Sequence, residues 1–145
     1  MTIKQLSIFV ENKSGSLARI IDILAANEID LRALSISETQ DFGILRLIVN
    51  DTFKAAQVLR NENCVVSITD VYAIAVPDQP GGLAKVLRLL ADAQVSVEYT
   101  YAFISNNRDY AYIAIRTAEK DVQTAKNIFM TNGTKVISED DLLNL

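Results

Sequence analysis

Two short polar segments have the residue types needed to bind a small charged molecule. They span residues 11–17 and 77–83. Each turns a strand pattern into a helical pattern through a glycine, which lets the backbone bend sharply and leaves room for a ligand. The first N–H groups of a helix and the positive end of its dipole attract a carboxylate or a phosphate. Asn12 and Asp78, three residues before Gly15 and Gly81, could take the ammonium or amide end of the same molecule.

A tight strand-to-helix connection also favours glycine, proline and a capping Asn or Asp for structural reasons alone. The sequence, however, repeats itself. Gly15-Ser16-Leu17-Ala18 recurs as Gly81-Gly82-Leu83-Ala84, and Ile29-Asp30-Leu31 recurs as Val95-Ser96-Val97, in both cases 66 residues later. Ala56 and Leu59 then match Ala125 and Ile128 at a spacing of 69, which predicts three added residues before the last helix of the second copy. Two copies of one small domain are therefore expected, with both loops in register.

Hydrophobic periodicity predicts the same order of elements in each half. In the first half it predicts strands at residues 5–11, 31–36, 43–49 and 65–69, a polar turn at 38–41, and helices at 16–27 and 52–61, the second with Phe53, Ala56 and Leu59 inward. In the second half it predicts strands at 71–76, 97–104, 110–116 and 135–137, one helix with Leu83, Val86, Leu87 and Leu90 inward, and another lined by Val122, Ala125, Ile128 and Phe129. This order predicts the α+β class, as two ferredoxin-like βαββαβ domains at residues 1–69 and 70–145, with antiparallel four-stranded sheets and helices on one face.

Composition excludes several function classes. The 145 residues carry a formal net charge of −4 and no histidine, which removes histidine-dependent triads and ordinary zinc sites. The basic residues are scattered, so nucleic acid is not expected as a partner. The acidic residues Asp30, Asp78 and Glu98 show no spacing that dictates acid–base chemistry. We therefore expect no catalytic residue, no metal and no cofactor.

The location of the protein is predicted from features that the sequence lacks. No apolar run approaches the roughly 20 residues of a membrane span. The first residues enter a strand pattern directly, without the charged and apolar regions of a secretory leader. The single cysteine, Cys64, cannot form an internal disulfide and is interpreted as a small core residue. A cytoplasmic protein that does not bind membranes is expected.

The second hairpin is predicted to carry an aromatic wall, made of Tyr99, Tyr101, Phe103, Tyr110 and Tyr112. A two-residue loop at Asn106-Asn107 would place Phe103 opposite Tyr110 and Tyr101 opposite Tyr112. The other face, expected to pack on the helices, has Ala102, Ile104, Ala111, Ile113 and Ile115. The wall either packs against another sheet or chain, or contacts a small ligand. The matching face of the first copy is smaller and more polar, with Ala33, Ser35, Ser37, Ile44, Arg46 and Ile48.

The loop motifs resemble those of the ACT domain, a small regulatory fold attached to many enzymes of amino-acid metabolism. The resemblance rests on Asp78-x-Pro80-Gly81-x-Leu83 and the looser Asn12-x-x-Gly15-x-Leu17, each followed by a short helix and then by Asp30 or Ser96 at the next strand. It covers nearly the whole chain as two tandem copies. It departs from the family pattern at Ser14, where proline is common, and at Asp30 and Ser96, where asparagine is often found.

The resemblance implies that two such domains pair and bind a free amino acid at their interface, between the glycine loop of one and strands of the other. By position, one site would contain Asn12, Lys13, Ser14, Gly15, Ser16, Leu17 and Asp30, and its counterpart Asp78, Pro80, Gly81, Gly82, Leu83 and Ser96. It further implies a non-enzymatic sensor, a homodimer, that regulates an enzyme, transporter or transcription factor in trans. Two alternatives stay open. One is an oligomerisation or protein-interaction module with vestigial ligand sites, and the other is a small enzyme.

Overall fold

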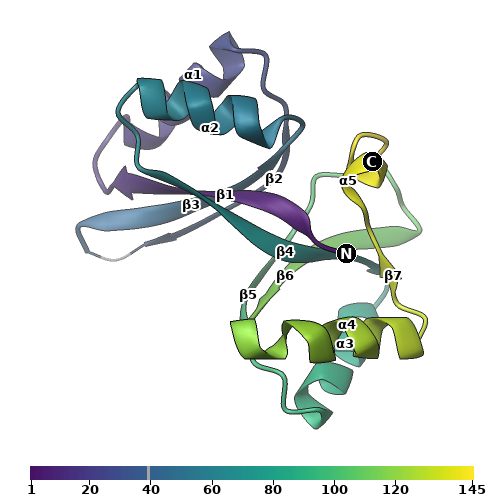
Figure 1. Ribbon diagram of the computed structural model, residues 1–145. Helices are drawn as coiled ribbons and strands as arrows, with labels where there is room; N and C mark the ends of the chain where they lie inside the picture. Colours follow the sequence, from purple (N-terminus) through teal and green to yellow (C-terminus); the bar gives the residue numbers. More distant parts are fainter. Residues whose placement is uncertain (39) are drawn as a thin grey trace. The chain divides into compact units, whose positions relative to one another are not determined.

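The computed structural model describes residues 1–38 and 40–145 and divides into two compact units. The first unit is Lys4–Thr69, and the second unit comprises Met1–Ile3 and Asp70–Leu145. Figure 1 traces both units along the chain. In the described residues, no helix is long and apolar enough to cross a membrane.

The first unit has the predicted βαββαβ order. Its elements are β1 (Ile3–Glu11), α1 (Ser16–Ala26), β2 (Leu31–Glu38), β3 (Phe42–Val49), α2 (Thr52–Asn61) and the beginning of β4 (Val66–Pro77). The strand order is β2-β3-β1-β4, and β3 pairs antiparallel with both β1 and β2. Both helices lie on one face of the sheet (Figure 1). Residue 39 of the turn predicted at 38–41 lies outside the described residues.

The core of the first unit lies between this sheet and its two helices. Alternating β1 residues point into it, as the period of two predicted. The fully buried members include Leu6, Ile8, Leu45, Leu47, Ala55 and Leu59. Phe53 was expected to face inward, but this prediction is wrong, because its side chain is 69% exposed. Successive residues of a helix are rotated by about 100° around its axis. The buried face of α2 therefore contains Ala55, Ala56 and Leu59, and Phe53 points away from it.

The second unit repeats the plan. It consists of the end of β4, α3 (Gly82–Asp92), β5 (Val97–Ala102), β6 (Tyr110–Thr117), the 3-10 turn η1 (Glu119–Asp121), α4 (Val122–Thr131), β7 (Lys135–Val136) and α5 (Glu139–Leu142). The strand order is β7-β4-β6-β5, with antiparallel pairing throughout. Helices α3 and α4 cover one face of the sheet, and α5 lies on its other side (Figure 1). The predicted inward residues of both helices pack in this core, as do Ala111, Ile113 and Ile115.

The predicted register of the second hairpin is wrong by two residues. Tyr101 pairs with Ala114, and the N–H of Phe103 donates to the carbonyl of Tyr112, so Phe103 does not face Tyr110. The two-residue loop is replaced by a longer one that Asn107 organises, because its Oδ1 accepts from the N–H groups of Asp109 and Tyr110 at 2.8 and 3.1 Å. Because the shift is even, the residues of β5 and β6 that pair still point to the same faces of the sheet as predicted.

Two further expectations need correction. Ala102 and Ile104 do not pack on the helices, since both are exposed, Ile104 by 57%. The last helices align at a spacing of 70 rather than 69. The N–H of Cys64 bonds the carbonyl of Leu59, and the N–H of Thr134 bonds that of Phe129, which makes Leu59 and Phe129 equivalent. The added residues lie in the longer hairpin loop and in η1, both surface connections.

Candidate functional site

The two glycine loops have nearly the same backbone geometry. Gly15 precedes α1 with φ of 85°, and Gly81 precedes α3 with φ of 88°. Both values lie in the left-handed region that glycine adopts without steric cost. In each loop the next residue donates its N–H backwards, Ser16 to the carbonyl of Lys13 at 3.2 Å and Gly82 to that of Gln79 at 3.0 Å. The predicted turn from strand to helix through glycine is therefore present twice.

The helix starts leave backbone donors unused. Neither α1 nor α3 has a side-chain cap. The first helical hydrogen bonds come from the N–H groups of Arg19 and Lys85, which donate to the carbonyls of Gly15 and Gly81. In the described part of the chain, the N–H groups of Leu17, Ala18, Leu83 and Ala84 have no acceptor. Unpaired donors at a helix start are the groups that a carboxylate or phosphate can use.

In the first loop the side chains bind one another. Lys13 Nζ lies 2.6 Å from Glu11 Oε2, and this hydrogen bond and charge lower the pKa of the Glu11 carboxyl. Asn12 donates its side-chain amide to the carbonyl of Gln40 at 3.4 Å, and its N–H donates to the carbonyl of Asp41 at 3.0 Å. The first loop is thus attached to the β2–β3 hairpin of its own unit.

The second loop has fewer such contacts. Its Pro77 and Gln79 stand where Glu11 and Lys13 stand in the first copy, so no ion pair forms there. The N–H of Asp78 donates to the carbonyl of Asp109 at 3.0 Å, and the N–H of Gln79 donates to that of Pro77 at 2.8 Å. Gly82 lies against the end of β4, because a Cβ built on it would be 2.2 Å from the Pro77 carbonyl oxygen.

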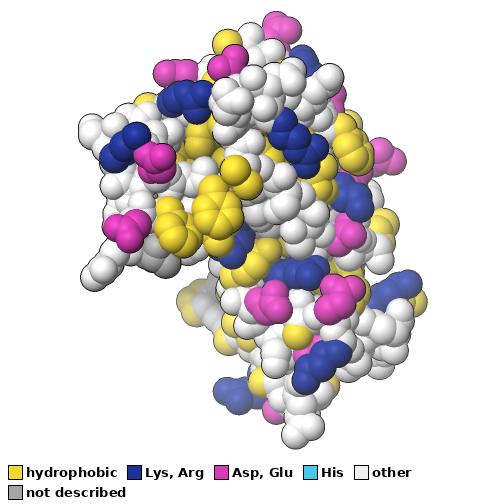
Figure 2. Space-filling model, turned by 60° about the vertical axis from the view of Figure 1, so that its left-hand side comes forward, with side chains coloured by type: hydrophobic (Ala, Val, Ile, Leu, Met, Phe, Trp, Pro, Cys, Tyr) yellow, Lys and Arg dark blue, Asp and Glu magenta, His cyan; other side chains and the backbone are white. Residues whose placement is uncertain are grey.

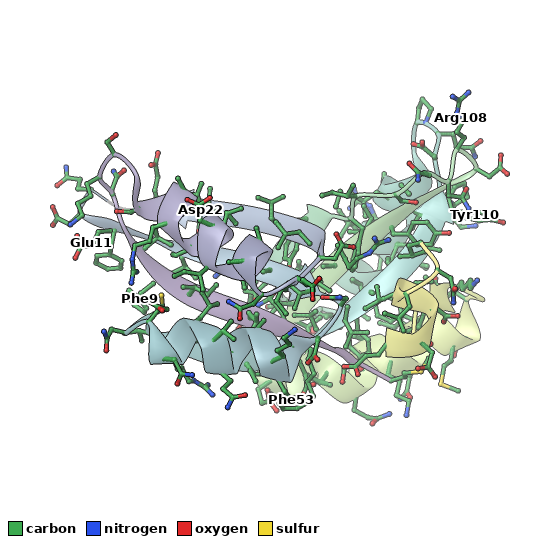
Figure 3. The ribbon with its side chains drawn as sticks, turned by 90° about the horizontal axis from the view of Figure 1, so that it is seen from above. Phe9, Glu11, Asp22, Phe53, Arg108 and Tyr110 are labelled. Carbon is green, nitrogen blue, oxygen red and sulfur yellow. The ribbon has the colours of Figure 1, made fainter. Side chains whose placement is uncertain are left out.

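A cavity of about 580 Å³ opens beside the second loop, and we call it the Lys85 cavity. It lies between the loop with the start of α3 on one side and the α4–β7 turn on the other. Its wall contains the predicted Pro80, Gly81 and Gly82, together with Gln79, Lys85, Val86, Leu89, Tyr110, Tyr112, Asn132, Gly133, Thr134 and Lys135. A volume of this size is in the range of small-molecule sites. Figure 3 shows Tyr110 at the end of β6, next to the hairpin loop with Arg108.

The first unit has a groove of about 440 Å³ in the equivalent place, which we call the Arg19 groove. Its wall contains Phe9, Glu11, Lys13, Ser16, Arg19, Phe42, Asn63, Cys64 and Val65. Phe9 and Glu11 lie near the end of β1 (Figure 3), and the rings of Phe9 and Phe42 are 5.2 Å apart between centroids. Hydrophobic side chains also gather on one face of this unit in the space-filling view (Figure 2). A smaller hollow of about 170 Å³ contains Asn12, Lys13 and Leu17 beside Ile36 and Gly43.

The structure does not bring Asp30 or Ser96 to the glycine loop of its own unit. Leu31 pairs with Val49 at one end of β3, whereas Glu11 pairs with Phe42 at the other end, on the order of 20 Å away at strand spacing. Ser96 is displaced from Gly81 in the same way along β6. The N–H of Asp30 bonds the Asn50 side chain, and that of Ser96 bonds Asp121 Oδ2. A site that contains both a glycine loop and one of these residues would need two domains.

The aromatic wall is only partly exposed. Phe103 and Tyr112 are buried, Tyr99 and Tyr101 are half-buried with stacked rings, and Tyr110 is 46% exposed. Tyr110 and Tyr112 line the Lys85 cavity, whereas Tyr99, Tyr101 and Phe103 do not. In the first copy, the six residues predicted to share one face of the hairpin do share it. The register pairs Ala33 with Ile48, Ser35 with Arg46 and Ser37 with Ile44.

Sequence reasoning missed the charged residues at the back of each loop, Arg19 and Lys85, and the α4–β7 turn with Thr134 and Lys135. Arg19 and Lys85 could have been found from the sequence, because the repeat spacing of 66 residues aligns them with each other. The turn could not, since it lies about 50 residues from Gly81 in sequence and reaches the cavity only through the fold. Among the described residues, His, Cys, Asp and Glu side chains form no group suited to a metal ion.

Comparisons with known proteins agree with this fold. A family model described as an ACT domain pair matches residues 1–145. The crystal structure of protein BT0572 from Bacteroides thetaiotaomicron is 42% identical, with a TM-score of 0.90 over 100% of this chain and 98% of that chain. The regulatory subunit of aspartate kinase from Thermus thermophilus, in its ligand-free form, is 13% identical with a TM-score of 0.63 over 88% and 90% of the two chains, a likeness of fold. None of the curated proteins matches the chain in sequence.

Proposed function

Because the chain belongs to the family of ACT domain pairs, we propose that it is a sensor that binds a free amino acid at its glycine loops. The proposal assigns one ACT domain to residues 1–69 and the other to 70–145. The observation that carries it is the set of unused N–H groups at Leu17, Ala18, Leu83 and Ala84, beside glycines in the left-handed conformation. These donors suit the carboxylate that every free amino acid has.

The proposed site residues follow from the loops. In the first domain they are Asn12, Lys13, Ser14, Gly15, Ser16 and Leu17, and in the second Asp78, Pro80, Gly81, Gly82 and Leu83. Asp30 and Ser96 would join a site contributed by two domains, either of one chain or of two chains in a homodimer. The ligand would change how the protein acts on an enzyme or regulator in trans. No residue is assigned a catalytic role, because the spacing of Asp30, Asp78 and Glu98 indicates no acid–base pair.

Isothermal titration calorimetry of the full chain against the twenty amino acids tests this proposal. We expect a saturable heat with one or a few of them. The variants Gly15→Ala and Gly81→Ala show which loop binds the amino acid, because a side chain at positive φ strains the backbone that presents the free N–H groups. The variant in the binding loop should lose the heat of binding. A Cβ at either position meets no atom within 4 Å, so both variants should fold. Absence of heat with all twenty at millimolar concentration would leave the interaction module as the better account.

A further inference from the structure

We infer that the Lys85 cavity binds a small carboxylate that has a net negative charge, and that the Arg19 groove does not. The inference rests on the proposed function and deepens it, since it gives the class of the ligand that the second copy binds. It predicts that an acidic amino acid or a dicarboxylate is preferred over a neutral or basic amino acid.

The charges that line the Lys85 cavity all have one sign. Its sixteen lining residues include Lys85 and Lys135 and no aspartate or glutamate, although the whole chain has 18 acidic and 14 basic residues. An ammonium group in this cavity would face two lysines without a carboxylate among the lining side chains. A cavity with one sign of charge concentrates ligands of the opposite sign. The lining therefore selects for negative charge.

Lys85 is available to a ligand. Within the described residues its ammonium group has no hydrogen-bond or ion-pair partner, and its side chain is exposed at the cavity. Lys135 is less available, because Asp141 lies near it: hydrogen bonds from Ser138 mainly lower the pKa of the Asp141 carboxyl, and the charge of Lys135 lowers it further. Lys85 is therefore the cation that we expect to bind the carboxylate.

The equivalent cation in the first copy is already used. Arg19 Nη2 donates to the carbonyl of Glu62 at 2.7 Å and lies 3.9 Å from the Glu62 carboxylate, while Nη1 lies 3.8 Å from Cys64 Sγ. The other charges of the Arg19 groove, Glu11 and Lys13, form an ion pair. These contacts pair the charges of the groove with other groups of the protein. The first copy therefore serves as a control site without an unpaired cation among its described residues.

Two further replacements act in the same direction. Phe42 and Tyr110 are equivalent, because they pair with Glu11 and Pro77 at the ends of matching strands. Cys64 and Thr134 are equivalent by the hydrogen bonds that end α2 and α4. The second copy thus has hydroxyl groups where the first has a phenyl ring and a thiol. Hydroxyl groups are donors for a carboxylate, and Val86 and Leu89 supply an apolar wall for the body of the ligand.

Titration calorimetry with glutamate, glutamine and succinate tests the inference on the full chain. Glutamate and glutamine have nearly the same shape and differ by one negative charge, and succinate has two carboxylates without an ammonium group. The variants are Lys85→Gln and its matched control Arg19→Gln. We expect glutamate and succinate to bind at least about fivefold more tightly than glutamine, and Lys85→Gln to weaken both by about five- to tenfold. Arg19→Gln should leave both affinities unchanged, and added salt should weaken them.

The outcomes separate this inference from the proposed function. Binding of another amino acid that Lys85→Gln does not affect would overturn the inference and support the amino-acid sensor. Binding of succinate that depends on Lys85, without binding of any amino acid, would support the cavity and overturn the sensor. Glutamine bound as tightly as glutamate, or equal losses in the Lys85→Gln and Arg19→Gln variants, would overturn the inference directly. The circular dichroism spectrum of each variant shows whether it folds.

Discussion

The Lys85 cavity and the Arg19 groove occupy the same place in two copies of one fold but differ in how their polar groups are used. In the groove, Arg19 binds the end of α2 through Glu62, and Lys13 binds Glu11. In the cavity, Lys85 has no partner among the described residues, and no acidic side chain lines the wall. Since Gly15 and Gly81 have nearly the same dihedral angles, the difference in how charges are paired arises from the side chains around them. Among the residues described, the first copy thus pairs its charged side chains with one another, whereas the second leaves a lysine unpaired, and the unused N–H groups at the helix start are common to both copies.

The largest effect is expected when the second loop is given the first loop's residue. In Gly82→Ser the new Cβ would overlap the backbone oxygen of Pro77, which a side-chain rotation cannot relieve. We expect the free energy of unfolding to fall by about 2 kcal/mol, as for other overpacked sites. Urea denaturation monitored by circular dichroism measures this. The reciprocal variant Ser16→Gly should lower the free energy of unfolding by less than about 1 kcal/mol. Equal decreases for the two variants would show that the two loops pack alike.

A smaller difference is expected from the two cations themselves. Arg19→Gln removes the hydrogen bond to the Glu62 carbonyl and should lower the free energy of unfolding by about 0.5–1 kcal/mol, because the guanidinium is half exposed. Lys85→Gln removes no contact in the described structure and should change it by less than about 0.5 kcal/mol. The same denaturation experiment compares both. A stability loss for Lys85→Gln as large as that for Arg19→Gln would mean that Lys85 is structural.

The smallest expected effect is in the titration of the first loop. The hydrogen bond and charge of Lys13 lower the pKa of Glu11 below its ordinary value of 4.5. A lowered folded-state pKa means that this pair stabilises the loop above the ordinary value and that the contribution is lost as pH falls through the folded pKa. The carbon-13 shift of the Glu11 carboxyl should therefore titrate below 4.5 in the native chain and near 4.5 in Lys13→Gln. An unchanged titration midpoint in Lys13→Gln would show that Lys13 does not stabilise the Glu11 carboxylate.

The fold could be predicted because its signals are local and repeated. The alternation of Leu6, Ile8 and Val10 and the duplicated Gly-x-Leu motif predict the elements and their order without any long-range information. Errors arose where a side chain changes the local geometry. Asn107 binds two following N–H groups and lengthens the hairpin loop, which turn-type preferences for Asn-Asn do not reveal. The exposure of Phe53 likewise depends on which stripe of α2 the sheet covers.

The candidate site could be predicted only in part. The loop residues Pro80, Gly81 and Gly82 were found because their types serve a sharp turn and a helix start. Lys135 and Thr134 reach the same cavity from the other end of the unit, so no spacing in the sequence connects them to the loop. The grouping of Asp30 with the first glycine loop came from the family resemblance and stays a prediction, because within one unit an eleven-residue helix separates the ends of the sheet where the two lie.

Strand β7 consists of two residues, Lys135 and Val136, which pair with Ala75 and Ile74 of β4, and the N–H of the following Ile137 donates to the carbonyl of Ala73 at 2.7 Å. Thr134 and Lys135 line the Lys85 cavity, and α5 is the element that follows β7. A ligand in the cavity would contact both this short edge strand and the start of α3, and so would hold the two together. Binding in the cavity should therefore slow amide hydrogen exchange in β7 and α5, which exchange measured with and without the ligand would detect.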